Sequence, residues 1–117
     1  MKNIILYSTD FSMCLSLLIY LQNNYKITTT TELDVVEELV KYQGFNLVLI
    51  DAEPTKKIEN FCKNLRLINP NIPLVLTYVY RDKSKEFDAN IRKYAHTIFY
   101  KPFDLPEISK QLSLLTI

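Results

Sequence analysis

The chain has 117 residues, of which 48% are hydrophobic and 23% charged, and its formal net charge at pH 7 is +1. A chain of this length forms one ordinary domain around a single core. Its hydrophobic content excludes a disordered chain, and its balanced charge gives no support for binding nucleic acid. No apolar run reaches the roughly 20 residues of a membrane span, and Asp10 comes too early for a signal peptide. We therefore expect a cytoplasmic protein with no membrane contact.

The residues that commonly bind zinc or form disulfides are few and dispersed. Cys14 and Cys62 lie in apolar helical patterns without a CxxC or Cys/His pair, so we expect buried, reduced thiols. His96 is the sole histidine, which excludes a histidine-based triad or metal cluster, and we interpret it as a surface residue at a loop end.

The first half of the chain alternates between strand and helix patterns. Residues 3–8 (NIILYS) predict a buried strand, residues 11–24 a well-buried helix, and residues 25–30 (YKITTT) a β-branched strand. Thr31 and Asp34 then have the spacing of a capping box at the start of the next helix.

The second half continues the alternation. Gly44, the only glycine, marks the end of the second helix. Strands are predicted at 45–51, 74–80 and 97–100. Three stretches between and after them have apolar residues at helical spacing: Ile58, Phe61, Cys62 and Leu65; Phe87, Ile91 and Tyr94 within 85–95; and Ile108, Leu112 and Leu115. Asp104 and Glu107 are predicted to cap the last of these helices.

Five apolar strands that alternate with five helices predict an α/β fold, with a parallel sheet covered by helices on both sides. In such open sheets, ligands bind beyond the carboxyl ends of the strands. Four polar residues stand at those ends: Asp10, Asp51, Thr77 and Lys101. The sequence therefore predicts a functional site where two carboxylates, a hydroxyl and an ammonium meet.

Three segments in the same order and context resemble the receiver domain of bacterial two-component response regulators. They are DFSM at 10–13, LVLIDAEP at 47–54 and, most specifically, FYKPFDLPEI at 99–108. The resemblance covers essentially the whole chain. It implies a (βα)5 flavodoxin-like, doubly wound sheet with strand order 2-1-3-4-5, and a single receiver domain at 1–117 with no output domain.

The resemblance also implies a chemistry for the strand ends. A histidine kinase or phosphotransfer protein would transfer a phosphoryl group to Asp51, with Mg²⁺ held by Asp10, Asp51 and the backbone carbonyl of Glu53. Lys101 would pair with the phosphoryl oxygens, and the hydroxyl of Thr77 would move to bind one of them. On this reading the protein is a phosphoacceptor rather than an enzyme, and the Lys-Pro peptide after the fifth strand is cis, as is usual in the family.

The chain departs from the family pattern in four places. In the loop after Asp51, the proline comes one position earlier than usual and the family's glycine is absent. Thr9 stands where one of two adjacent acids is usual, although the carboxylate of Glu53 could compensate. Counting from the preceding proline leaves open whether Thr77 or Tyr78 occupies the hydroxyl position, and a tyrosine ring there should obstruct the phosphoryl donor. Ile98 replaces a switching aromatic, so the output would pass through other groups, such as Tyr100, Phe103 or the helix near Asp82.

The output would then be contact with a downstream protein, and a homodimer through the last two helices is an open alternative. A rival interpretation is a pseudo-receiver, an interaction module that works without phosphorylation; Thr9, Tyr78 and Ile98 favour it, whereas Asp10, Asp51 and Lys101 oppose it. A more distant rival, a small flavin binder, lacks a phosphate-cradling loop after the first strand.

Overall fold

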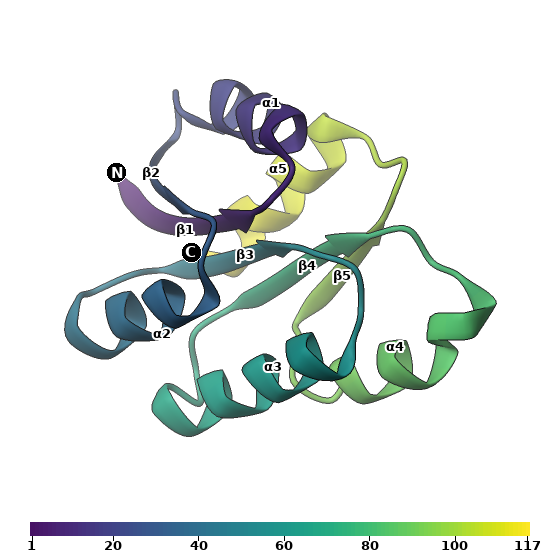
Figure 1. The fold of residues 1–117 in the computed structure, drawn as a ribbon. Coiled ribbons are helices and arrows are strands. Elements are labelled where there is room, and N and C mark those ends of the chain that lie inside the picture. Colours follow the sequence, from purple (N-terminus) through teal and green to yellow (C-terminus); the bar gives the residue numbers. More distant parts are fainter.

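The computed structural model describes residues 1–117 as alternating strands and helices (Figure 1). The strands are β1 (Lys2–Ser8), β2 (Tyr25–Thr30), β3 (Leu47–Asp51), β4 (Leu74–Tyr78) and β5 (Thr97–Tyr100). The helices are α1 (Phe11–Leu21), α2 (Leu33–Tyr42), α3 (Lys56–Ile68), α4 (Lys85–Ile91) and α5 (Leu105–Leu115), with a short 3-10 turn at Asp82–Ser84 before α4.

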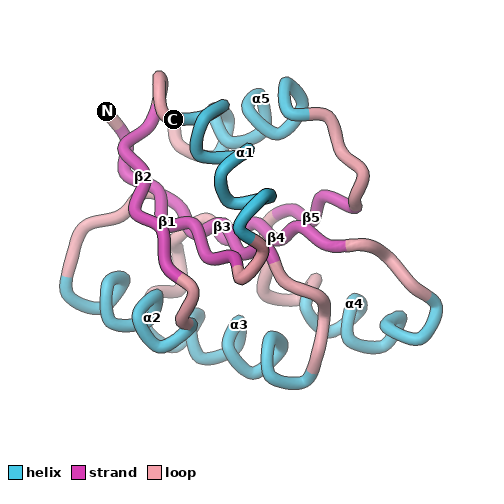
Figure 2. Tube along the Cα trace, turned by 45° about the horizontal axis from the view of Figure 1, so that its top comes forward, coloured by secondary structure: helices cyan, strands magenta, loops and turns pink.

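All five strands are parallel and form one sheet in the order β2-β1-β3-β4-β5. Helices α1 and α5 cover one face, and α2, α3 and α4 cover the other (Figures 1 and 2). The predicted flavodoxin-like (βα)5 fold and its strand order are therefore confirmed.

The apolar runs of the strands are divided between two cores because successive side chains of a strand point to opposite faces. In β1, Ile4 and Leu6 join the core under α1 and α5, whereas Ile5 and Tyr7 join the larger core under α2, α3 and α4. Both faces are buried, as the continuous hydrophobic runs predicted.

Helix α3 contributes its predicted face to the larger core. Ile58, Phe61, Cys62 and Leu65 are all buried, and the side chain of Thr55 caps the helix by accepting the N–H of Ile58 at 3.2 Å. Burial raises the pKa of the Cys62 thiol to about 12, which keeps it protonated. Both cysteines are free, and Cys14 is half-buried rather than fully buried as predicted.

Several predicted helix boundaries are wrong. The capping box of Thr31 and Asp34 does not form: Glu32 is the N-cap of α2 without a side-chain hydrogen bond, and the hydroxyl of Thr30 accepts the N–H of Glu32 at 3.1 Å. Helix α4 ends at Ile91 rather than at residue 95. Asp104 is the N-cap of α5, as predicted, but makes no side-chain cap hydrogen bond.

His96 is exposed, as predicted, but it also has a structural contact. Its Nδ1 lies 3.1 Å from the N–H of Leu74 and 3.0 Å from Nη2 of Arg66, so it acts as an acceptor for both donors. Burial and the Arg66 charge lower the pKa of His96, which favours this neutral form. None of the helices combines the length and apolar character needed to cross a membrane.

Candidate functional site

The candidate site is built on one level of three neighbouring strands. Ser8 of β1 lies opposite Asp51 of β3, and Asp51 lies opposite Thr77 of β4. Residues on one level of a parallel sheet point to the same face, and neighbouring strands are only about 4.8 Å apart. Phe99 of β5 continues the level, and Lys101 follows two residues later. The site therefore lies at the carboxyl edge of the sheet, on the side of α1 and α5.

Asp51 is only 3% exposed, and its carboxylate accepts from three side chains. The hydroxyls of Ser8 and Thr77 donate to Oδ2 and Oδ1, each at 2.8 Å. Nζ of Lys101 lies 2.7 Å from Oδ1 and forms an ion pair with it. Such pairing and hydrogen bonding stabilise a buried carboxylate, which would otherwise be costly to desolvate.

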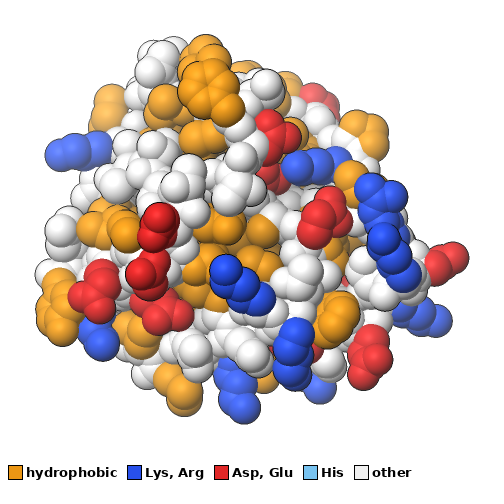
Figure 3. Space-filling model, in the orientation of Figure 1, with side chains coloured by type: hydrophobic (Ala, Val, Ile, Leu, Met, Phe, Trp, Pro, Cys, Tyr) orange, Lys and Arg blue, Asp and Glu red, His pale blue; other side chains and the backbone are white.

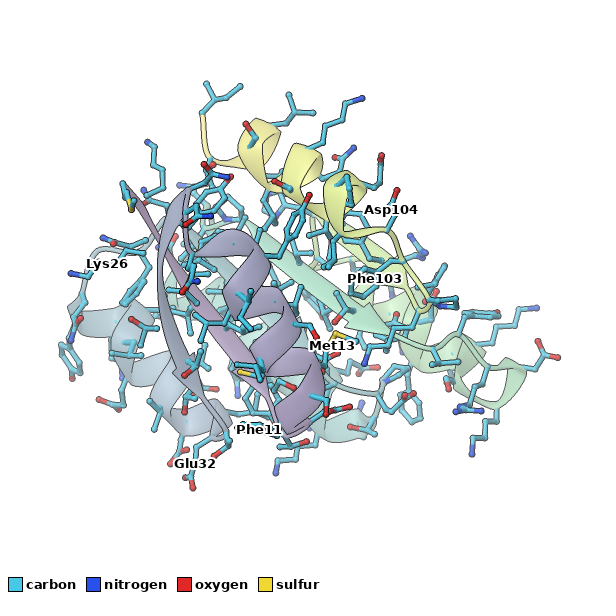
Figure 4. All side chains as sticks on the ribbon, turned by 90° about the horizontal axis from the view of Figure 1, so that it is seen from above. Phe11, Met13, Lys26, Glu32, Phe103 and Asp104 are labelled. Atoms are coloured by element: carbon cyan, nitrogen blue, oxygen red, sulfur yellow. The ribbon has the colours of Figure 1, made fainter.

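The structure brings the side chains of Asp51, Thr77 and Lys101 together, as the sequence predicted. The peptide bond between Lys101 and Pro102 is cis, as the resemblance implied. Beside Lys101, a hollow of about 520 Å³ separates α1 from the loop before α5 and is lined by Met13 and Phe103, among others. Figure 4 shows Met13 on the side of α1 that faces Phe103. This hollow offers an approach to the Lys101 side of the site.

The predicted metal ligands Asp10 and Glu53 lie in the loops that follow β1 and β3. Ser8 links Asp10 to Asp51, because its hydroxyl oxygen accepts the N–H of Asp10 at 3.0 Å and its hydroxyl donates to Asp51 at 2.8 Å. Asp10 is exposed and caps α1, where its Oδ1 accepts the N–H of Met13 at 3.2 Å. Glu53 is exposed in the loop before α3. No group of three or more His, Cys, Asp or Glu side chains is placed to hold a metal ion. The magnesium site that the resemblance implied needs only two carboxylates, those of Asp10 and Asp51, with the backbone carbonyl of Glu53, and it stays a prediction.

The hydroxyl position left open by the sequence is taken by Thr77, whose side chain points toward Asp51. Tyr78, the next residue, points to the opposite face of the sheet and is 1% exposed in the larger core. Its ring therefore does not lie in the position from which we expected it to obstruct Asp51. Ile98 packs against the same larger core.

A second buried carboxylate, Asp88 of α4, was not singled out by the sequence. Its Oδ2 accepts the hydroxyls of Tyr78 and Tyr100, each at 2.7 Å, and its Oδ1 lies 3.0 Å from Nε of Arg92. We call these four residues the Asp88 cluster. The spacing of Asp88 and Arg92, four residues apart in a helix, was a readable signal for the pair, but the tyrosines come from different strands.

Burial and hydrogen bonding act in opposite directions on the pKa of Asp88. Burial acts to raise the pKa of Asp88, but hydrogen bonds from Tyr78, Tyr100 and Arg92 outweigh it, and the pKa of the carboxyl lies below its ordinary value. Burial and Asp88 together raise the pKa of Tyr78 and of Tyr100. The cluster is therefore a carboxylate held by neutral phenols and one guanidinium.

Ser8 is the member of the site that the sequence interpretation missed. The sequence did carry a signal for the placement of Ser8: IILYS at 4–8 and LVLID at 47–51 share one pattern, an apolar run that ends in a polar residue. Aligning the two runs places Ser8 beside Asp51. The sequence interpretation considered the acid that follows the first strand, Asp10, and not the last residue of the strand itself.

A large groove lies away from the Asp51 site. A groove of about 700 Å³ between α2 and α3 has Tyr7 and Phe61 among its lining residues, with Glu32, Asp34 and Glu37 on one side and Lys57 on the other. Figure 3 shows a group of acidic side chains left of the centre of the face that is drawn, and further acidic side chains among the Lys and Arg side chains on its right. No single-sign field covers the face that is shown.

No protein-family model and no curated protein matches the sequence. The chain is similar in structure to the N-terminal signal receiver domain of a two-component response regulator from Bacteroides fragilis, with a TM-score of 0.84 and 16% identity over 100% of this chain and 98% of that chain. It is also similar to a CheY-like receiver domain protein from Methanospirillum hungatei, with a TM-score of 0.81 and 16% identity over 97% and 92% of the two chains.

A third solved structure is described as belonging to a novel family of redox sensors in the streptococci that evolved from two-component response regulators. Its TM-score is 0.85 and its identity 17%, over 99% of this chain and 51% of that chain. The three likenesses agree on the architecture at low sequence identity. The fold of this protein is thus that of the response regulator receiver domains.

Proposed function

We propose that this protein is a receiver-type signalling module that accepts a phosphoryl group on Asp51 with the help of Mg²⁺ and passes its signal by protein contact. The observation that carries the proposal is the convergence of Asp51, Thr77 and Lys101 at the carboxyl edge of the sheet. These residues supply a nucleophile, a hydrogen-bond donor and a cation within one pocket. They are the groups that phosphoryl transfer to a carboxylate needs for attack and for charge stabilisation.

In the proposed reaction, an oxygen of Asp51 attacks the phosphorus of a phosphohistidine on a histidine kinase or phosphotransfer protein. The new O–P bond forms as the P–N bond breaks, and the electron pair leaves on the imidazole, giving an acyl phosphate. Lys101 pairs with the transferred phosphoryl oxygens. Thr77, which donates to Asp51 at 2.8 Å, would transfer its hydrogen bond to the same group.

The output side of the proposal rests on α4 and β5. The Asp88 cluster joins α4 to both β4 and β5, and Tyr78 of this cluster follows Thr77 directly in β4. A displacement of Thr77 by the new phosphoryl group would therefore act on the residue that holds α4. A downstream protein, or a second copy of this chain, would read the position of α4 and α5.

The experiment is incubation with Mg²⁺ and a small phosphodonor, acetyl phosphate or phosphoramidate, beside a no-metal control, followed by intact mass measurement. We expect a gain of one phosphoryl group, about 80 Da, that Asp51→Asn abolishes. Asp34→Asn, which removes an exposed acid of α2, is the matched control and should retain the gain. No gain in a folded wild-type protein with either donor would reject the proposal.

A second candidate is the pseudo-receiver, an interaction module that needs no phosphorylation. It is favoured by the two hydrogen bonds and the ion pair that already engage the Asp51 carboxylate. The streptococcal neighbour, whose description places it in a family of redox sensors, illustrates this fold in another signalling context. Under this candidate, Asp51→Asn would leave binding to the downstream protein unchanged.

A further inference from the structure

The groove between α2 and α3 has a floor and two walls of different chemistry. The two helices contact each other and lie side by side on one face of the sheet (Figures 1 and 2). This face is opposite the one that α1 and α5 cover, so the groove is separate from the Asp51 site. Its volume of about 700 Å³ is larger than a single side chain needs.

Tyr7 of β1 forms part of the floor. It is 8% exposed, its ring belongs to the larger core, and its hydroxyl makes no hydrogen bond within the protein. A buried tyrosine usually places its hydroxyl on a partner, as Tyr78 does on Asp88. Every side-chain nitrogen or oxygen that is closed off from solvent has a partner, so the hydroxyl of Tyr7 opens into the groove. Burial and the charge of Asp51 raise its pKa, which keeps the phenol neutral.

The α2 wall of the groove is acidic. Glu32, Asp34 and Glu37 line it, Lys57 is the only cation among the lining residues, and none of these four side chains forms an ion pair. Glu32 and Asp34 stand at the start of α2, where acids stabilise a helix in any case. Glu37 lies one turn further and is half-buried, so the helix start does not account for it. The groove therefore keeps an excess of negative charge.

The α3 wall adds amides and an aromatic ring. Lys57, Asn60, Phe61 and Asn64 have the spacing of one helix face, and all four line the groove. The asparagine amides offer further acceptor oxygens, and Phe61 is buried. The lining thus places carboxylate, amide and phenol oxygens around aromatic side chains.

This combination favours a guanidinium over other cations. The three carboxylates are not gathered at one point as metal ligands are. A guanidinium is planar, carries five N–H donors, pairs with carboxylates through two hydrogen bonds and stacks on aromatic rings. An ammonium is a compact charge with three donors and uses fewer of these acceptors.

We infer that the groove between α2 and α3 binds an arginine side chain of a partner protein, with Glu37 paired to the guanidinium and the hydroxyl of Tyr7 accepting one of its N–H groups. Charge complementarity selects this partner, and the exposed edges formed by Asp34, Asn60 and Asn64 leave room for the chain that carries the arginine. The inference adds a contact surface that does not depend on phosphorylation of Asp51.

The test is an NMR titration of the unphosphorylated protein with the capped pentapeptide acetyl-Gly-Ala-Arg-Ala-Gly-amide. We expect saturable shifts of the backbone amides at residues 33–37 and 57–64, with a Kd on the order of 1 mM. The same peptide with citrulline, the neutral isostere of arginine, should bind about tenfold more weakly, because it lacks the charge that pairs with the carboxylates. A lysine peptide should also bind more weakly than the arginine peptide.

Variants of the protein locate the binding site. Glu37→Gln should weaken binding of the arginine peptide about tenfold. Glu38→Gln removes the same charge from the next, exposed position, which does not line the groove, and should stay within about twofold of the wild type. Tyr7→Phe keeps the ring, removes only the hydroxyl and should weaken binding about threefold. The amide spectrum of each variant checks that it is folded.

Four results would overturn the inference. They are shifts that do not saturate or that lie outside the groove, a citrulline or lysine peptide that binds as tightly as the arginine peptide, and a loss in Glu38→Gln equal to that in Glu37→Gln. The fourth is binding of agmatine, a free guanidinium compound, more than about tenfold tighter than the peptide, which would make the groove a small-molecule site. No phosphodonor is used, so a failure to phosphorylate Asp51 leaves these measurements unchanged and the two proposals fail separately.

Discussion

The two buried carboxylates of this protein, Asp51 and Asp88, are held in different ways. Both accept from two hydroxyls and one cationic side chain. The cation at Asp51 is a lysine with a 22% exposed side chain, whereas the cation at Asp88 is an arginine that is half exposed. Asp51 belongs to a strand, and its hydrogen bonds and ion pair go to residues at the carboxyl ends of the strands. Asp88 belongs to a helix, and its hydrogen bonds attach that helix to the sheet.

This difference separates a site suited to chemistry from a structural attachment. Asp51 lies beside a hollow that contacts Lys101, and its donors are small groups that can transfer to a new oxygen atom. Asp88 is enclosed by Tyr78 and Tyr100, whose rings pack edge to face at 5.8 Å between centroids. The Asp88 cluster should therefore contribute more to stability than the Asp51 site, and Asp51 more to function.

The largest effect is expected from Asp88→Ala. It leaves the buried hydroxyl of Tyr78 and the hydroxyl of Tyr100 without their acceptor, which should reduce the free energy of unfolding by about 3 kcal/mol. Urea denaturation measures the loss. Glu86→Ala, at an exposed position of the same helix, is the control and should remain within about 0.5 kcal/mol of the wild type. A loss below about 1 kcal/mol would show that α4 is held mainly by apolar packing.

The two cations should differ in their contribution to stability. Lys101→Met leaves Asp51 buried without its counter-charge and should cost about 2 kcal/mol, whereas Arg92→Met removes a half-exposed partner and should cost about 0.5 kcal/mol. Thermal unfolding at low and high salt checks this order, because added salt should reduce the smaller contribution further. Equal costs would contradict the distinction between an enclosed and an open ion pair.

Adjacent residues of β4 allow the coupling of the two sites to be measured. Thr77→Val removes one donor from Asp51 and should cost about 1 kcal/mol, and Tyr78→Phe removes one donor from Asp88 and should cost about 1.5 kcal/mol. In the absence of phosphate, the double variant should be additive within about 0.5 kcal/mol, because the side chains lie on opposite faces. A larger interaction free energy would show that the sites are coupled even in the unmodified protein.

The smallest expected effect is the pH dependence of the Asp88 cluster. Because the pKa of Asp88 is lowered in the folded protein, its contribution is present above the ordinary aspartate pKa of about 3.9 and is lost as pH falls through the folded value. The stability difference between the wild type and Asp88→Asn should therefore narrow below pH ~4. Urea unfolding across this range provides the measurement, and a constant difference would assign the loss in Asp88→Asn to packing.

The sequence by itself determined the fold and the principal members of the candidate site. Hydrophobic runs of strand length, separated by helical spacing, leave a parallel sheet covered on both faces as the consistent solution. Asp51, Thr77 and Lys101 each follow or end such a run, so the carboxyl edge of the sheet had to bring them close. These conclusions depend on local patterns, which can be read along a chain.

Only the tertiary structure decided which neighbours complete each site. Ser8 rather than Asp10 donates to Asp51 because strand register places Ser8 level with Asp51, whereas Asp10 lies beyond the end of β1 and caps α1. Within a strand, successive side chains point to opposite faces of the sheet. The same alternation directs the side chain of Thr77 toward Asp51 and that of Tyr78 toward Asp88 of α4. The Asp88 cluster joins residues of β4, α4 and β5, and its contacts arise from the packing of a helix on the sheet. No local pattern in the sequence records that packing.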